Sequence, residues 1–291
     1  MDRIPIAREA ARRAIELREQ IGVAPNEPVN VIEVAERLGI MVHLSPQTSV
    51  EGLYARTNPP NIITSAHRPS GRITFSIGHE LGHHIYGHPG VSIDEMKDAE
   101  EPFGEKPLHE MQADYFSGHF LMPNRGVRAA LAARKWDPKA LLPDQAFRLA
   151  CVFGVSYAAM AAQLRFNLNM IDQPSHARLL SLKPMEIKES ILGIEHPRDL
   201  MVIDRSWENP SVDLRTGDFA MVAGDCRVEG ACGAVEGKAG AWTIIKPIRQ
   251  GIGKILRPEG PVVLRVSGKM NGDYFTGLST NRFEEDPDDA P

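Results

Sequence analysis

Two histidines and a glutamate in residues 77–84 have the types and the spacing of a metal-dependent hydrolytic site. The stretch reads Ile-Gly-His-Glu-Leu-Gly-His-His, so His79 and His83 stand four residues apart and enclose Glu80. Positions i and i+4 of a helix share one face, so both imidazoles can reach one tetrahedral zinc ion. Glu80 follows the first histidine and can act on water as a general base rather than as a ligand. The alternative is a pair of ordinary histidines on a solvated or buried helix face.

A catalytic zinc site needs a third protein ligand and keeps one position open for water. The segment 108–121 has the pattern of a second amphipathic helix, which Pro123 closes. Its Glu110 and Asp114 are again four residues apart and face the same way. We expect Glu110 to be the third ligand and Asp114 to accept a hydrogen bond from the N–H of a ligating histidine. On spacing alone, a solvated acidic face explains this pair equally well.

The residues around these motifs predict the elements that must position them. Apolar residues at helical spacing predict a helix over 4–22, and Asn30 can cap a second helix over 31–38 that Gly39 ends. Three short strands, the helix with the histidines and an acid-rich loop follow at 40–44, 50–56, 61–64, 73–86 and 92–107. We therefore expect a domain of helices with a small sheet over 1–125. An extended peptide could pair with the strand 61–64, taken as an edge of that sheet.

The next segment, 126–178, reads as all-helical and carries seven basic and three acidic side chains. Within it, 146–160 has the pattern of a helix-turn-helix (HTH), with Gly154 at the turn and Ser156 as the cap of the second helix. A DNA reader needs basic or amide side chains at the start of that helix. The helix starts Tyr-Ala-Ala-Met-Ala-Ala instead, so a structural hairpin is favoured and direct nucleic-acid binding is not expected.

From residue 179 the chain changes to short runs of Val, Ile, Thr and Gly, which are typical of short antiparallel strands. We predict a β-rich C-terminal domain over 179–283, for which sensor, substrate-docking and autoinhibitory roles all stay open. Residues 284–291 hold five acids and no base, and this tail is predicted to be disordered. Cys226 and Cys232 have no histidine nearby and are expected to pack as ordinary residues rather than to bind a metal.

The overall composition excludes several classes of protein. The formal net charge is −5, and the acidic tail accounts for all of it, which excludes a strongly basic nucleic-acid coat protein. No run approaches the roughly 18 apolar residues of a membrane span, and the charged N-terminus lacks a signal-peptide core. Three scattered cysteines do not make a disulfide framework, so we expect a cytoplasmic protein without a membrane segment. The sequence leaves the oligomeric state open.

The motif HELGHH, followed by E-x-x-A-D-x-F and a closing L-M-P, resembles the ImmA/IrrE family of bacterial zinc metallopeptidases. The resemblance covers about residues 1–170 and is most specific over 72–123. In that family a glutamate thirteen residues before the proline binds zinc, which corresponds to Glu110, and Asn is common in place of Asp114. The resemblance implies an α+β fold with a zincin-like N-terminal domain and an HTH-like hairpin. In some members a GAF-like sensor domain follows.

The implied function is that of a zinc-dependent endopeptidase whose substrate is a bacterial transcriptional repressor, cut to induce a stress or mobile-element response. Glu80 would take a proton from water and pass it to the leaving amine. Seven acids between Asp94 and Glu110 would form an acidic mouth that favours a basic partner, such as a DNA-binding repressor. The sequence leaves the oxyanion-stabilising donor open among Tyr54, His84, Tyr86, His88, Tyr115 and His119.

Two other functions compete with this one. The first is a non-enzymatic transcriptional regulator, either a pseudo-peptidase or a DNA-binding protein that uses the HTH-like segment. The intact set of His79, Glu80, His83 and Glu110 argues against a decayed site, and the Ala-rich second helix argues against DNA. The second is a different zinc hydrolase that acts on small substrates.

Overall fold

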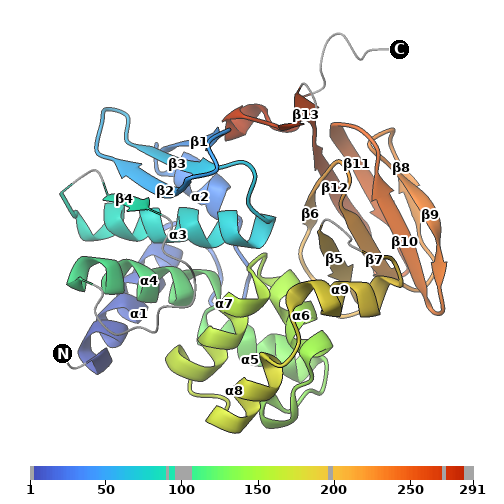
Figure 1. Ribbon diagram of the computed structural model, residues 1–291, viewed down its shortest axis with the longest axis horizontal. Coiled ribbons are helices and arrows are strands. Elements are labelled where there is room, and N and C mark those ends of the chain that lie inside the picture. The colour runs from blue at the N-terminus through green and yellow to red at the C-terminus, as the bar shows by residue number, and fades with distance from the viewer. Residues whose placement is uncertain (1–2, 90–91, 96–106, 196–198, 271–272, 285–291) are drawn as a thin grey trace.

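The computed structural model describes residues 3–89, 92–95, 107–195, 199–270 and 273–284, and its arrangement is shown in Figure 1. The fold is α+β, as predicted, with a helix-covered sheet at one end, a helical segment below it and two further sheets at the other end. The elements of the first part are α1 (Arg3–Gln20), α2 (Val31–Arg37), β1 (Met41–Ser45), β2 (Val50–Ala55), β3 (Asn61–Ser65), α3 (Ser70–Tyr86), β4 (Ser92–Glu95) and α4 (Leu108–Leu121).

The sheet of the first part has the strand order β15 (Gly277–Leu278), β1, β3, β2, β4. β1 and β3 are parallel, and the other neighbours are antiparallel. The prediction of an edge strand at 61–64 is therefore wrong, because β1 and β2 cover both sides of β3. Within the described part of the chain, the short strands β4 and β15 form the two edges.

The first two helices hold this sheet and α4 together. Asn30 caps α2 as predicted, since its side-chain oxygen accepts from the backbone N–H groups of Ile32 and Glu33. α1 packs along α4 and buries Arg18, whose guanidinium donates to the carbonyl of Phe120 at 2.8 Å. Because Phe120 lies in the last turn of α4, this bond satisfies a carbonyl that the helix end leaves open.

Glycines on α3 bring α3 and α4 into close contact. A Cβ placed on Gly82 would lie 3.0 Å from the Cα of Ala113, and one placed on Gly78 would lie 2.6 Å from Oγ of Ser117. Gly78 and Gly82 are four residues apart and line the helix face that meets α4. The short distance between the helices is what allows side chains of α4 to reach the histidines of α3.

We predict that Gly82→Val destabilises the protein by about 2–3 kcal/mol, because its side chain meets the backbone of α4. Gly82→Ala should have a smaller effect, since the better helix propensity of Ala offsets about 1 kcal/mol of the overpacking. Urea unfolding of both variants and the wild type measures the difference. Equal stability of Gly82→Val and the wild type would contradict the close packing of the two helices.

The middle segment is helical, as predicted. It comprises α5 (Asn124–Ala133), a 3₁₀ turn (Pro138–Ala140), α6 (Pro143–Val152), α7 (Tyr157–Ala162), a π-helical turn (Gln163–Asn167) and α8 (Gln173–Leu179). Gly154 adopts a φ of +62° between α6 and α7, and the hydroxyl of Ser156 accepts from the N–H of Ala159. α7 is only six residues long, and its Tyr157 and Met160 are buried. Little of α7 is therefore left to meet a partner.

In the described residues, no single helix is long and apolar enough to cross a membrane. One bent pair of helices, 143–152 with 157–167, passes the same test by length and composition alone. Both halves of this pair contribute fully buried side chains, such as Leu149 and Met160, to the protein core.

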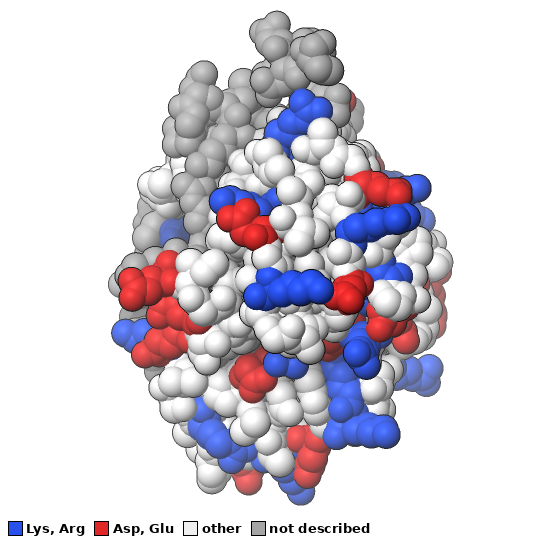
Figure 2. Space-filling model, turned by 90° about the vertical axis from the view of Figure 1, so that its right-hand side faces the viewer, with Lys and Arg blue, Asp and Glu red and all other residues white. Residues whose placement is uncertain are grey.

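The C-terminal segment contains α9 (Pro184–Leu192) and two four-stranded sheets, ordered β5-β7-β10-β9 and β6-β12-β11-β8. The strands are β5 (Leu200–Ile203), β6 (Ser211–Arg215), β7 (Phe219–Ala223), β8 (Arg227–Glu229), β9 (Gly233–Ala239), β10 (Trp242–Pro247), β11 (Gly251–Leu256) and β12 (Val262–Ser267), followed by β13 (Lys269–Met270) and β14 (Asp273–Tyr274). The prediction of antiparallel strands is correct for most pairs but wrong for β5 with β7 and β6 with β12, which are parallel. Figure 2 shows basic and acidic side chains interspersed on the face at this end.

The C-terminal segment is tied to the start of α3. Arg215 of β6 donates to the carbonyls of Ala66 and Arg68 at 2.9 and 2.6 Å and to the hydroxyl of Ser70. Asp199 accepts from the backbone N–H of Ser70 at 3.3 Å. Farther along the chain, β15 joins the first sheet beside β1. The β-rich segment therefore buttresses the helix that carries the histidines.

Candidate metal centre

α3 presents its functional side chains on two faces. His79 and His83 face α4, and Glu80 faces β2. Nε2 of His79 lies 3.1 Å from Oε2 of Glu110, and Nε2 of His83 lies 3.5 Å from Oε1 of Glu110. The two Nε2 atoms are 3.0 Å apart. The structure therefore brings together the three side chains that the sequence predicts as ligands.

The spacing of these three atoms fits a tetrahedral metal. Ligand bonds of about 2.0–2.1 Å place neighbouring tetrahedral ligands about 3.3 Å apart, and the three measured separations are 3.0, 3.1 and 3.5 Å. Two imidazoles and one carboxylate are a donor set suited to zinc. The residues present therefore fit a divalent metal.

The charge states around the centre support cation binding. Burial by itself would lower the pKa of His79, but hydrogen bonds to Asp114 and Glu110 outweigh it and raise this pKa well above its usual value. Burial would likewise raise the pKa of Glu110, yet hydrogen bonds from His79 and His83 hold it far below its usual range. Glu110 is thus a carboxylate at neutral pH in a pocket where its side chain is 12% exposed. A metal cation would take over the neutralising role that the proton on His79 has here.

Asp114 lies where the sequence predicts a supporting acceptor. Its Oδ1 is 2.9 Å from Nδ1 of His79, so Nδ1–H donates to it and Nε2 is directed at the centre. The four-residue offset on α4 gives Glu110 and Asp114 one shared face, and each contacts a different nitrogen of the same imidazole.

His83 has a support of its own, which the sequence does not reveal. Nδ1 of His83 lies 2.9 Å from Nδ1 of His88, and Nε2 of His88 lies 3.1 Å from Oε1 of Gln112. When Nε2 of His83 is a ligand, its Nδ1–H must donate to His88, and His88 then donates to Gln112. His88 is one of the six candidates for the oxyanion-stabilising donor, whereas no sequence pattern singles out Gln112. Its position two residues after Glu110 becomes informative only once α4 is packed against α3.

We predict a measurable loss of metal affinity when these supports are removed. His88→Leu and Asp114→Leu should each weaken metal binding by about 10- to 100-fold, because the ligand rings lose their fixed orientation. Asp114→Asn, which keeps an acceptor oxygen, should change the affinity by less than about 3-fold. Competition with a chromogenic chelator measures the three affinities. Equal affinities for Asp114→Leu and Asp114→Asn would contradict the role of the acceptor.

Glu80 is about 100° around α3 from His79 and is fully buried against Gly52 of β2. One turn farther along the same face, His84 meets Tyr54 of β2, with 2.7 Å between Oη of Tyr54 and Nδ1 of His84. Burial raises the pKa of Tyr54 and, together with Arg56, lowers the pKa of His84, so both are neutral. Two neutral groups therefore share this hydrogen bond, and its donor is set by the tautomer of His84.

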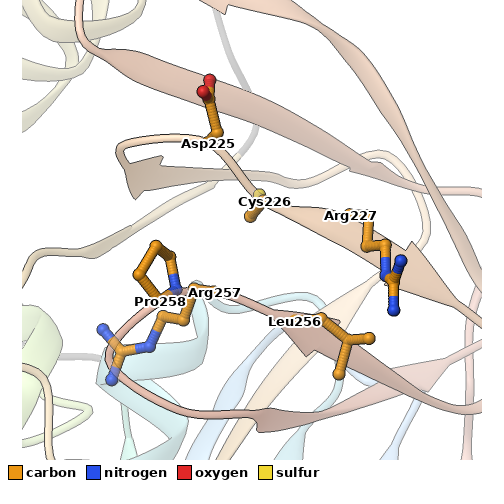
Figure 3. A pocket seen from close by; sticks show the side chains of 6 residues that line it. All are labelled: Asp225, Cys226, Arg227, Leu256, Arg257 and Pro258. Atoms are coloured by element: carbon orange, nitrogen blue, oxygen red, sulfur yellow. The ribbon is translucent and has the colours of Figure 1, made fainter.

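One predicted feature is not described by the structure, and one pocket lies away from the metal centre. The side chains of the acid-rich mouth between Asp94 and Glu105 are outside the described residues. A shallow pocket of about 390 Å³ lies on the C-terminal sheets and is lined by Asp225, Cys226, Arg227, Leu256, Arg257 and Pro258 (Figure 3). The guanidinium of Arg257 donates to the backbone carbonyls of Asp204, Trp207 and Gly260, so it supports the loops around the pocket.

Residues 35–165 match the Peptidase_M78 family model, described as the IrrE N-terminal-like domain. No curated protein matches the chain. The matched span runs from α2 to the π-helical turn and includes the whole metal centre, so the resemblance to the ImmA/IrrE family is confirmed there. Residues 35–165 of this chain thus form an IrrE N-terminal-like domain, which belongs to a metallopeptidase family.

Proposed function

We propose that this protein is a zinc-dependent endopeptidase with a zincin-like catalytic domain. The observation that carries the proposal is the meeting of His79, His83 and Glu110 at ligand spacing, with Glu80 buried one residue from the first ligand. A pseudo-peptidase would have no need for this complete set. The family match over the same residues supports the assignment.

The chain's own residues account for the proton transfers of peptide hydrolysis. Zinc held by the three ligands would polarise the scissile carbonyl and lower the pKa of water. Glu80 accepts a proton from the attacking water, whose oxygen bonds to the carbonyl carbon. As the C–N bond breaks, Glu80 delivers this proton to the leaving nitrogen. Asp114 and His88 hold the two histidines in place during these steps.

The proposed substrate is a DNA-binding transcriptional repressor, whose cleavage would induce a stress or mobile-element response in the cytoplasm. The acid-rich sequence between Asp94 and Glu110 supports a basic partner. An extended segment of the substrate would pair with β4, the edge strand next to β2, rather than with β3. Direct DNA binding is not part of the proposal, because α7 is short and turns its largest side chains into the core.

The test is incubation of the zinc-loaded protein with the purified repressor encoded nearest to its gene. The proposal predicts two fragments with one new N-terminus, identified by mass spectrometry, and no fragments with the Glu80→Gln variant. Salt-dependent binding to operator DNA by the protein alone, without cleavage, would instead support the regulator.

A further inference from the structure

We propose that Gly52 is a positioning residue that sets the location of the Glu80 carboxylate through its lack of a side chain. Gly52 lies on β2 between Thr64 of β3 and Asp94 of β4 in the strand register. A Cβ placed on Gly52 would lie 2.5 Å from Oε1 of Glu80 and 3.2 Å from its Cδ and Cγ. These distances are well inside van der Waals contact, so the carboxylate uses the space that any other residue would fill.

The surroundings explain why this space matters for Glu80. The residue is completely buried on α3, and burial leaves its carboxylate few places to go. On one flank stands His79, which is fixed by Asp114 and Glu110. On the next turn of the same face, His84 is held by Tyr54, two residues along β2 from Gly52. β2 thus supplies a gap for Glu80 and a hydrogen-bond partner for His84.

The backbone conformation at position 52 does not require glycine. Its φ is not in the left-handed region, in contrast to the glycines at helix ends such as Gly39 and Gly87. Glycine inside a strand weakens it, because the residue loses more entropy on folding and has no side chain to pack. The close approach of Glu80 is a sufficient reason for its presence. A Gly52→Ala side chain would push the carboxylate away from the reacting water rather than distort the strand.

The inference rests on the proposed function for its catalytic part, so the test has one arm that does not depend on hydrolysis. Thermal unfolding of the metal-free protein is measured for Gly52→Ala alone and combined with Glu80→Ala. We expect Gly52→Ala to lower Tm by about 3–6 °C in the wild-type background. In the Glu80→Ala background, it should lower Tm no more than the control Gly237→Ala does. Gly237 is also in a strand, and no atom lies within 4 Å of a Cβ placed there.

The second arm measures peptide hydrolysis in a double-mutant cycle with Glu80→Asp. Gly52→Ala should reduce kcat by about 10- to 100-fold with little change in KM or in bound metal, because only the base is displaced. In the Glu80→Asp background the same change should reduce kcat by less than about 3-fold, since the shorter side chain withdraws from β2. A merely structural glycine would give the same factor in both backgrounds.

The results of the two arms distinguish a failure of the inference about Gly52 from a failure of the proposed peptidase function. Coupling between positions 52 and 80 in both arms supports the inference. Equal Tm decreases in the two backgrounds, or a kcat of Gly52→Ala equal to that of the wild type, would overturn it. A wild-type protein that binds zinc but hydrolyses no peptide would instead overturn the proposed function, and the Tm arm would still test the contact.

Discussion

Glu80→Gln is expected to reduce kcat for peptide hydrolysis by about 10³-fold and to leave bound zinc at the wild-type level. The amide keeps the size of the side chain but cannot accept a proton from water, and general acid-base catalysis contributes about 10²- to 10⁴-fold. Zinc should stay bound because the candidate ligands are His79, His83 and Glu110, and Glu80 is not among them. Single-turnover cleavage, together with metal analysis of the same preparation, measures both effects.

A matched substitution controls for the loss of one negative charge. Glu16→Gln changes an exposed glutamate of α1, whose side chain is 55% exposed, and should leave kcat unchanged. If Glu80→Gln hydrolyses peptides at the wild-type rate, Glu80 is not the general base. If it loses zinc together with activity, Glu80 supports the metal rather than the proton transfer.

Glu110→Gln is expected to have the largest effect on metal binding. The neutral amide is a weak ligand, so zinc affinity should fall by more than the roughly 10- to 100-fold expected for the supporting residues. In the wild type, zinc at 100 times its Kd should stabilise the folded protein by about 2.7 kcal/mol. The variant should show a much smaller rise in Tm at the same zinc concentration. Differential scanning calorimetry with and without zinc measures this difference.

The interpretation of Glu110→Gln depends on the variant remaining folded. Glu110 has a 12% exposed side chain and accepts from His79 and His83, and the amide of Glu110→Gln keeps one acceptor oxygen for them but no charge. The far-UV circular dichroism of the metal-free variant should nevertheless match the wild type, because the core of α3 and α4 is apolar. A folded Glu110→Gln protein with wild-type zinc affinity would contradict its role as a ligand.

The sequence predicts the bounds and caps of individual helices better than it predicts which strands pair with one another. The helix 108–121 was predicted with its observed bounds because Pro123 and the apolar spacing define it locally. The cap at Asn30 is equally local. The edge position of 61–64 was wrong because strand order depends on pairing with β1, which no local pattern encodes. For the same reason, the parallel pairs β5 with β7 and β6 with β12 could not be read from alternation.

Helical periodicity predicts that the candidate ligands His79 and His83 share a face, whereas the choice of Glu110 over a solvated acidic face rested on the family resemblance. The residues that support the histidines were harder to predict, since each contacts a side chain of another helix or loop. Asp114 was predicted from its four-residue offset from Glu110, whereas Gln112 contacts His88 only through the packing of α4 on α3. Gly52 has no side-chain functional group that a sequence motif could reveal. Its significance lies in the close approach of Glu80, which only the three-dimensional arrangement makes visible.

The most direct test of the central claim is an unbiased search for peptide-bond cleavage. A library of peptides derived from a whole proteome is incubated with zinc-loaded wild type and with zinc-loaded Glu80→Gln, and new N-termini are identified by mass spectrometry. A metal centre built from His79, His83 and Glu110 with Glu80 as its base predicts new N-termini with the wild type only. The absence of new termini with a stoichiometrically zinc-loaded wild type, or the same termini with both proteins, would contradict it.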